Sequence, residues 1–263
     1  MRRYLTLFWV QFRASSAAAM QYRVDFLVQG GISFFWALLT LIPLWVVFSS
    51  GRTSVAGWSY PEALVVLGWF TLLKALLEGA INPSLIAVVD HIRKGTLDFV
   101  LLKPADAQFL VSTAKFEFWK VSDALAALGI FVYAFHELGR VPTPLHLLQA
   151  LALLVIAAGV IYSLWIIVIS MAFYVVRIDN LSYLFVSIYD AARWPVSMFT
   201  GALRFVFTYV IPLALMTTYP AMALLGTLEG GTWIVALAGG VVFSGLARAV
   251  WTMSLSRYTS ASS

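Results

Sequence analysis

The stretch "FLVQGGISFFWALLTLIPLWVVFSSG", residues 26–51, contains no charged residue. A helix crosses the hydrocarbon core of a bilayer with about 20 apolar residues, each adding about 1.5 Å. Residues 141–176 and 230–247 are also free of charge. Of the 263 residues, 62% are hydrophobic and 11% are charged, whereas a soluble domain has roughly 25% charged residues. The sequence therefore predicts an all-α polytopic membrane protein, with residues 1–263 forming a single transmembrane domain.

Six membrane-spanning helices are predicted. Their ranges are 26–48, 62–80, 116–135, 145–174, a fifth beginning near residue 181, and 232–253. The third span has a polar first half that contains Glu117, Lys120 and Asp123. Cytoplasmic loops of membrane proteins are enriched in Lys and Arg. With the N-terminus in the cytoplasm, twelve Lys and Arg residues lie inside or at the inner boundary, and only Arg52 and Arg140 lie on outer loops. Both termini are therefore predicted to be cytoplasmic.

Residues 205–228 are also uncharged and long enough to span. If residues 181–203 and 205–228 both crossed the membrane, the last span would run outward and place Arg248 and Arg257 outside. The parity of the spans therefore favours one crossing in this region.

Two prolines support the same interpretation. Pro212 and Pro220 lie within the uncharged stretch, and proline removes a backbone donor and interrupts a helix. Broken helix at membrane depth is tolerated where protein or a water-filled cavity covers it. We predict a re-entrant hairpin over residues 205–228 at the outer face, with Pro212, Tyr219 and Pro220 as its characteristic residues.

The N-terminus, "MRRYLTLFWVQFRASSAAAM", has the composition of an amphipathic segment. Its apolar core is interrupted by Gln11 and Arg13, so it is too short for a span or a signal peptide. We predict an interfacial helix over residues 1–24, with Arg2, Arg3 and Arg13 directed toward lipid headgroups.

Charge is concentrated in "VVDHIRKGTLDFVLLKPADAQF", residues 88–109, within a predicted cytoplasmic segment over residues 81–111. The part "SLIAVVDHIRKG" predicts a short amphipathic helix that ends at Gly95, since glycine commonly follows a helix C-terminus. Thr96 or Asp98 is placed to cap the next turn. Two interpretations are open: a solvated loop that sets orientation, or a docking helix for a cytoplasmic partner.

The part "IRKGTLDFVLLKP", residues 92–104, resembles a signature of the permease subunits of ABC transporters in the ABC type-2 exporter group. The branch is one of short six-span permeases with the pattern G-x-L-D-x-x-L-x-K-P, and it includes proteins described as viologen exporters. The matching residues are Gly95, Leu97, Asp98, Leu101, Lys103 and Pro104. The later "IPLALMTTYP", residues 211–220, resembles the outer hairpin of the same branch.

The resemblance implies that the charged segment is a coupling helix, which seats in a groove of an ATPase subunit. The implied coupling residues are Asp90, His91, Arg93, Lys94, Gly95, Thr96, Leu97 and Asp98. The chain has no G-x-x-x-x-G-K-[ST] phosphate loop. ATP and Mg are therefore expected in a partner ATPase dimer, with no cofactor in this chain. A second, similar or identical permease and the bacterial plasma (inner) membrane are implied as well.

Ionisable side chains inside membranes usually face an interior or a cavity. Lys74 and Glu78 are four residues apart on the second span, and Asp190 and Arg193 are three apart near the fifth. These four residues are candidates for a translocation path. The alternative is that each pair only neutralises itself, at the spacing that favours helical ion pairs.

A stripe of small residues, Ala236, Gly240 and Ser244, recurs every four residues on the last span. Such a stripe permits close helix packing, either within the subunit or against a second permease.

Other functional classes lack their residues. There is no cysteine, and His136 and His146 do not have a metal-ligand spacing. Tyr189-Asp190 occurs without the Gly-x-Gly-Asp of intramembrane aspartyl proteases. The cations lie beside the spans, which argues against nucleic acid as a partner. No catalytic or metal-binding residue is predicted. The preferred function is a permease for ATP-driven export, and the alternatives are a membrane scaffold or channel subunit without ATP coupling, or an intramembrane enzyme.

Overall fold

The computed structural model describes residues 2–51, 53–174 and 179–258, and for residues 179–182 it describes the backbone only. The α-helices are α1 (Arg2–Gln21), α2 (Arg23–Leu39), α3 (Leu41–Ser49), α4 (Tyr60–Leu76), α5 (Asn82–Arg93), α6 (Asp98–Leu101), α7 (Ala107–Ser112), α8 (Val121–Leu138), α9 (Pro144–Ser170), α10 (Asp179–Tyr189), α11 (Gly201–Phe205), α12 (Tyr219–Leu225) and α13 (Gly230–Leu255). Within these ranges the only β-pairing is an isolated bridge between Val55 and Trp58.

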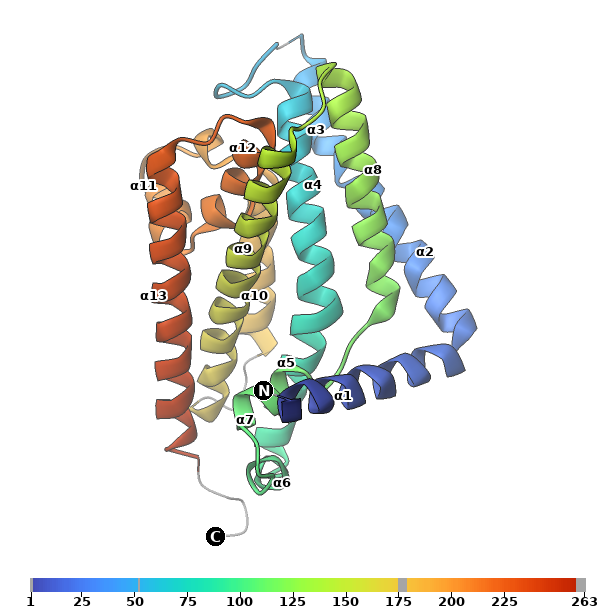
Figure 1. Cartoon of the computed structure of the whole chain (residues 1–263), viewed down its shortest axis with the longest axis vertical. Helices are drawn as coiled ribbons and strands as arrows, with labels where there is room; N and C mark the ends of the chain where they lie inside the picture. The colour runs from blue at the N-terminus through green and yellow to red at the C-terminus, as the bar shows by residue number, and fades with distance from the viewer. Residues whose placement is uncertain (1, 52, 175–178, 259–263) are drawn as a thin grey trace.

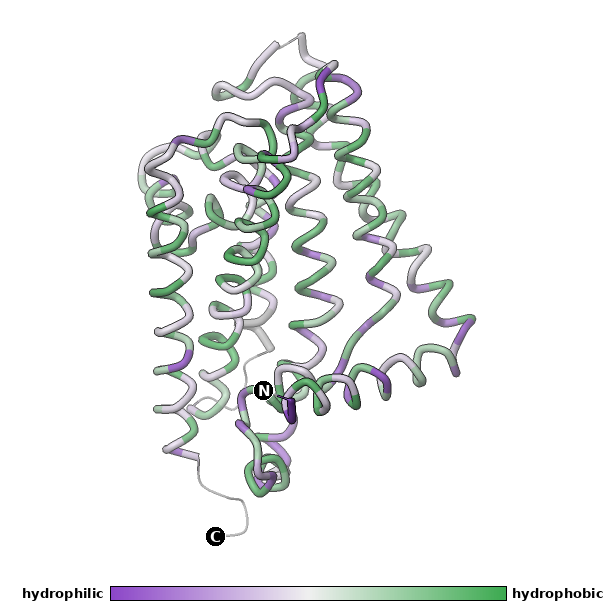
Figure 2. Tube along the Cα trace, in the orientation of Figure 1, coloured by the Kyte–Doolittle hydropathy of each residue, from purple (hydrophilic) through white to green (hydrophobic). Residues whose placement is uncertain are grey.

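Five helical stretches are long and apolar enough to cross a membrane. They are Arg23–Ser49, Tyr60–Arg93, Phe118–Leu138, Pro144–Phe173 and Gly230–Leu255. A bent helix pair, Gly201–Val210 with Ala214–Leu225, raises the number to six if it counts as one span. Figure 2 shows these helices as mainly hydrophobic, with hydrophilic residues gathered around α6 and α7. The predicted all-α polytopic fold is confirmed.

Helix α1 lies across one end of the bundle, and α13 ends at that same end (Figure 1). Phe8 and Phe12 of α1 pack edge-on against Phe116, while Leu5 and Trp9 are exposed. This combination of a docked face and an exposed apolar face is typical of an amphipathic helix in the membrane interface. The first and last described residues therefore share one side of the molecule.

Helix α4 forms the centre of the bundle. It begins with a capping box, in which the Ser59 side chain and the Glu62 carboxylate each pair with the other's backbone N–H. All its residues from 63 to 71 are buried. It packs against α8 so closely at Gly68 that a Cβ atom there would meet the Phe131 ring at 2.6 Å. A central helix that is apolar all round is buried by its neighbours on every side.

The predicted coupling helix is not a separate element, which corrects the sequence-based boundary. α4 runs into α5 through a π turn, η1 (Leu77–Ile81), to form one helical stretch from Tyr60 to Arg93. Pro83, near the start of α5, is accommodated because the preceding π turn changes the hydrogen-bond spacing, so the missing N–H breaks no regular α-helical bond. The second span therefore continues directly into the end of the molecule that carries α6.

The predicted fifth span is also different from the sequence-based expectation. Residues 181–203 do not form one helix: α10 ends at Tyr189, and a 3₁₀ turn, η4 (Asp190–Arg193), follows it. Trp194 then adopts an extended backbone, with φ −103° and ψ 139°, because the residue before a proline disfavours the helical region. Arg177, predicted to be an inner cation, lies outside the described residues.

The uncharged stretch after Arg204 is broken, as predicted. The pair Gly201–Val210 and Ala214–Leu225 bends by 68° at a break that contains Pro212. Pro220 does not break it, which corrects the second proline assignment: it occupies the first turn of α12, after a π turn, η7 (Ala214–Thr218). α11 and α12 lie at the end of the molecule opposite α1 (Figure 1).

The small-residue stripe on α13 divides between two environments. Ala236 is fully buried, and a Cβ on Gly240 would lie 3.1 Å from Ile156 of α9. Ser244 is exposed. The first two residues therefore serve packing within the subunit, against α9.

The arrangement predicts which ends share a membrane face. Because the chain has no cysteine, single cysteines at Thr53, Thr143 and Lys103, all exposed, can be labelled one at a time. We expect a membrane-impermeant maleimide to label Thr53→Cys and Thr143→Cys in intact cells, and Lys103→Cys only after permeabilisation. Labelling of all three from one side would contradict the topology. Ser260, the other inner position suggested by the sequence, lies outside the described residues.

Candidate functional site

A polar cavity of about 480 Å³ lies within the spans, between α2, α4, the start of α8 and the η4 turn. Its wall contains six ionisable side chains: Lys74, Glu78, Lys120, Asp123, Asp190 and Arg193. Aromatic side chains, among them Trp36 and Phe70, line the remainder. All four candidate path residues from the sequence are therefore brought together in one cavity.

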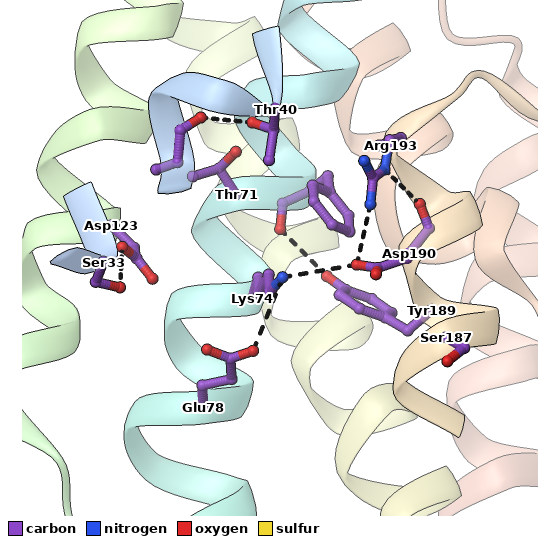
Figure 3. A network of polar contacts seen from close by, with 12 residues as sticks. Ser33, Thr40, Thr71, Lys74, Glu78, Asp123, Ser187, Tyr189, Asp190 and Arg193 are labelled. Atoms are coloured by element: carbon purple, nitrogen blue, oxygen red, sulfur yellow. Dashed lines mark hydrogen bonds and ion pairs between the residues drawn. The ribbon is translucent and has the colours of Figure 1, made fainter. Parts of the chain in front are cut away.

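Asp190 stands between two cations (Figure 3). Its Oδ1 atom lies 3.6 Å from Lys74 Nζ and 3.3 Å from Arg193 Nη2. The Arg193 Nε also donates to the Asp190 carbonyl at 2.8 Å. Both cations lie over the Phe70 ring, at 5.7 and 5.5 Å from its centroid. The expected pairing of Asp190 with Arg193 is present, but it is shared with Lys74.

Lys120 stands between two carboxylates in the same way. Its Nζ contacts Glu78 Oε2 directly and donates to Asp123 Oδ2 at 3.1 Å. Ser33 of α2 completes the cluster, because it accepts from Lys120 at 3.0 Å and donates to Asp123 at 2.5 Å. The Lys120 and Asp123 side chains are only 10% and 6% exposed. Buried charges of this kind persist only when they are paired and hydrogen-bonded.

The π turn positions Glu78. The Gly79 carbonyl, whose helical donor four residues on would be the N–H that Pro83 lacks, accepts from the N–H of Glu117 at 2.8 Å. This bond holds the start of α8 against η1, where Lys120 meets Glu78. Lys74 lies 3.9 Å from Glu78, so the expected self-contained pair is a loose contact and Lys120 is the principal partner. π turns are rare and often mark functional positions.

The charged segment, residues 88–109, folds as a protrusion that we call the tip. α5 ends at Arg93, and Gly95 takes a φ of +66°, which favours glycine. α6 then forms the part of the helical structure farthest from α11 and α12 (Figure 1). Leu97 is fully buried and anchors the tip, whereas Phe99 and Leu102 are 69% and 80% exposed. Large apolar side chains that are exposed side by side mark a protein or membrane contact.

The polar residues of the tip lie partly as expected. Asp90, Arg93 and Lys94 are exposed. His91 is half-buried and its Nδ1 lies 2.8 Å from the Thr96 hydroxyl, so it is not on the outward face. Asp98 is the first residue of α6 and follows the N-cap position, Leu97.

Neither Thr96 nor Asp98 is the N-cap residue of α6, which is Leu97. The next helix, α7, is capped by Asp106, whose Oδ1 accepts from the N–H of Phe109 at 3.0 Å. Asp106 adopts the non-helical backbone that a capping residue requires, and Asp98 lies inside the helix.

Direct bonds tie the tip to the membrane helices. Arg248 of α13 donates to Asp106 at 2.7 Å and to Gln108 at 2.8 Å. Gln108 in turn donates to the Tyr162 hydroxyl of α9 at 3.0 Å. Ser84 of α5 donates to the Lys115 carbonyl at 2.7 Å.

The pKa of Asp106 responds to these bonds. Partial burial raises the pKa of this carboxyl, but the hydrogen bond from Arg248 and that from the Phe109 N–H together outweigh it, so the pKa lies below its usual value. The Asp106–Arg248 contact therefore contributes stability above the ordinary pKa of an aspartate and loses it as the pH falls through the lowered value.

Comparison with known proteins places the chain in a family. A model described as ABC-2 family transporter protein matches residues 34–262. The chain belongs to the ABC-2 transporter family. No curated protein and no solved structure matches it. An ABC-2 permease is a membrane subunit of a transporter and is not itself an enzyme, and the resemblance drawn from residues 92–104 is confirmed at the level of the family.

The end of this ABC-2 permease opposite α1 carries a second hollow. A cavity of about 620 Å³ is lined by the α11–α12 pair and by Trp58, whose indole N–H donates to Ser197 at 2.9 Å. Of the three predicted hairpin residues, Tyr219 lies in its wall, whereas Pro212 and Pro220 do not.

Sequence reasoning did not select five residues that the structure places at these sites. Lys120, Asp123 and Ser33 belong to the cavity, and Phe99 and Leu102 to the tip. The polar start of the third span was a usable signal for the first two. Within residues 2–51, 53–174 and 179–258, no cluster of His, Asp and Glu could hold a metal ion in this ABC-2 permease.

Proposed function

We propose that this chain is the permease subunit of an ATP-driven ABC exporter, in which it forms half of a translocation path and couples to a separate ATPase. The observation that carries the proposal is the tip: an apolar contact surface outside the spans, bonded directly to α9 and α13 and continuous with α4. A simple channel needs no such surface. ATP and Mg would be bound by the ATPase dimer, since this chain has no phosphate loop.

The path itself is proposed to include the six-charge cavity. Lys74, Glu78, Asp190 and Arg193 line it together with Lys120 and Asp123, and ionisable groups at membrane depth commonly mark substrate pathways. The exposed Trp36 of α2 stands at its wall. A second permease, similar or identical, would supply the facing half of the path.

Places in the transporter are also proposed for the α11–α12 hairpin, the two termini and the charged residues around α6. The α11–α12 hairpin would close the outer end of the path, with both termini in the cytoplasm of a bacterial inner membrane. Asp90, Arg93 and Lys94 would surround the apolar contact on α6 and confer specificity, because rim charges set partner choice more than affinity.

The test is purification of the tagged full-length chain from its native membrane, followed by reconstitution in proteoliposomes. We expect a phosphate-loop ATPase to co-purify and to hydrolyse ATP. A chain that purifies without an ATPase, under conditions that preserve a known ABC complex, would contradict the proposal and favour a scaffold or channel.

The link between the tip and α13 predicts a charge-reversal effect. Asp106→Arg places two cations together and should uncouple ATP hydrolysis from transport, because α13 would no longer follow the tip. The double variant Asp106→Arg with Arg248→Asp restores opposite charges and should recover coupling relative to the single variant, since the loss of the Asp106 cap on α7 is common to both. The measurement is the number of ATP molecules hydrolysed per substrate transported. Equal coupling in the single and double variants would remove this link from the mechanism.

A further inference from the structure

We infer that the cavity is built for a compact zwitterion with an apolar or aromatic body, rather than for a simple cation or anion. The inference rests on the proposed function and names the substrate class of the same site. It begins with how the six charges divide.

The six charged side chains form two groups of three, or triads, with opposite net charge. Lys74, Asp190 and Arg193 make one, with two cations and one carboxylate. Glu78, Lys120 and Asp123 make the other, with two carboxylates and one cation. The first has one surplus positive charge and the second one surplus negative charge. The cavity is therefore neutral as a whole but dipolar along its length.

The triads meet at Lys74 and Glu78, the loosest contact in the network. Lys74 Nζ and Glu78 Oε1 are 3.9 Å apart, beyond hydrogen-bond distance. The ammonium of Lys74 also stays 3.6 Å from Asp190, so its three donors make no hydrogen bond to any described residue. A carboxylate or other small anion in the cavity would satisfy them.

Glu78 offers the complementary group. Its Oε2 atom is engaged by Lys120, while Oε1 has only the distant Lys74. Asp123 has no such spare atom, because Ser33 and Lys120 take both of its oxygens. A ligand ammonium therefore has an open acceptor next to the open donor on Lys74. Asp190 Oδ1 also accepts no hydrogen bond from a described residue, but it lies between the two cations Lys74 and Arg193, which repel a ligand ammonium.

An open donor and an open acceptor 3.9 Å apart match a ligand whose own carboxylate and ammonium are adjacent. A cation alone would gain Glu78 but face Lys74 and Arg193, and an anion alone would face Glu78 and Asp190. Unfavourable charge pairs of this kind provide discrimination. Trp36, 62% exposed, supplies an apolar wall, and about 480 Å³ is enough for a small-molecule ligand.

Three matched probes separate the alternatives: phenylalanine, which is zwitterionic, 2-phenylethylamine, which is cationic, and 3-phenylpropionate, which is anionic. Binding is measured by isothermal titration to the full-length chain in lipid nanodiscs. We expect phenylalanine to bind at least about tenfold more tightly than either single-charge probe, the factor that about 1.4 kcal/mol supplies. Equal or tighter binding of 2-phenylethylamine, or no binding of phenylalanine, would overturn the inference.

Two variants test which side chain binds the carboxylate of the ligand and which binds its ammonium. Lys74→Met should weaken phenylalanine binding and leave 2-phenylethylamine binding equal or stronger. Glu78→Gln should weaken phenylalanine binding and leave 3-phenylpropionate binding equal or stronger. Lys115→Met, which removes a cation outside the cavity, is the control and should change none of the three. A uniform loss across all probes in both variants would also count against the inference.

The result is independent of the ATPase test. If the ATPase co-purifies but phenylalanine does not bind, the substrate class is wrong and the proposed function stands. If phenylalanine binds with the predicted selectivity but no ATPase co-purifies, the ligand class stands and the ATP-driven function is wrong.

Discussion

We expect that replacing both Phe99 and Leu102 with aspartate weakens binding of the proposed ATPase partner by more than about 100-fold. Burying one large apolar side chain is worth about 1.5–3 kcal/mol, and the two side chains are 69% and 80% exposed in the isolated chain. Losing both contacts removes at least about 3 kcal/mol, and each tenfold in affinity corresponds to about 1.4 kcal/mol. The new carboxylates would also be desolvated at the contact, which adds to the loss.

Co-purification and ATPase activity of the reconstituted complex measure the effect. The control is Val141→Asp, the same kind of change at an apolar residue that is 85% exposed on the opposite end. Arg93→Glu with Lys94→Glu tests the charged rim, where we expect weakened assembly or uncoupling of a smaller size while the chain still inserts. If the rim variant abolished assembly and the apolar variant assembled normally, the contact surface would be the charged one indicated by the sequence.

Replacing Lys120 with methionine will destabilise the membrane domain by about 3 kcal/mol or more. The side chain is 10% exposed and lies between Glu78 and Asp123. Removing one member of a buried ionic cluster leaves the others uncompensated, which typically costs about 3–5 kcal/mol. The change also removes the donor to Ser33.

Thermal unfolding in detergent or nanodiscs measures this loss. The triple variant Lys120→Met, Glu78→Gln, Asp123→Asn removes the stranded charges and should recover most of the stability. Lys115→Met is the matched control, since its pair with Glu117 is 60% exposed at the lysine and exposed pairs contribute at most about 1 kcal/mol. An unchanged unfolding temperature for Lys120→Met would show that the cluster is not paired in the membrane.

The fold could be predicted from the sequence because membrane helices depend on local composition. A run without charge, such as residues 26–51, must be helical in lipid whatever it packs against. The break at Pro212 was visible for the same reason. The π turn after Leu76 was not, because Gly79 and Pro83 at the junction equally predict a helix end, and only tertiary contacts select a continuous helix with a wider turn.

The cavity could be predicted in part. Lys74 and Glu78 lie about one helical turn apart, as do Asp190 and Arg193, so the sequence alone reveals both pairs. Lys120 is 42 positions from Glu78, so their contact depends on how α8 packs on α4, which no spacing reveals. Phe99 and Leu102 were missed because apolar residues in a hydrophobic chain are expected to be buried or in lipid, and their exposure appears only when α6 is placed beyond the spans.

The wider turn of η1 has a consequence for the chain's tolerance of insertions and deletions. Each residue of an α-helix advances the helix by about 100°. A π turn takes up one extra residue over nearly the same rotation as a regular turn. Deleting one residue within Leu77–Ile81 would therefore let the stretch close into regular helix and leave Ser84 and α6 facing nearly the same way. The same deletion elsewhere in Tyr60–Arg93 would turn everything after it by about that angle. An aligned one-residue gap at this position in a related sequence therefore marks the loss of the π turn and leaves the direction of the tip unchanged.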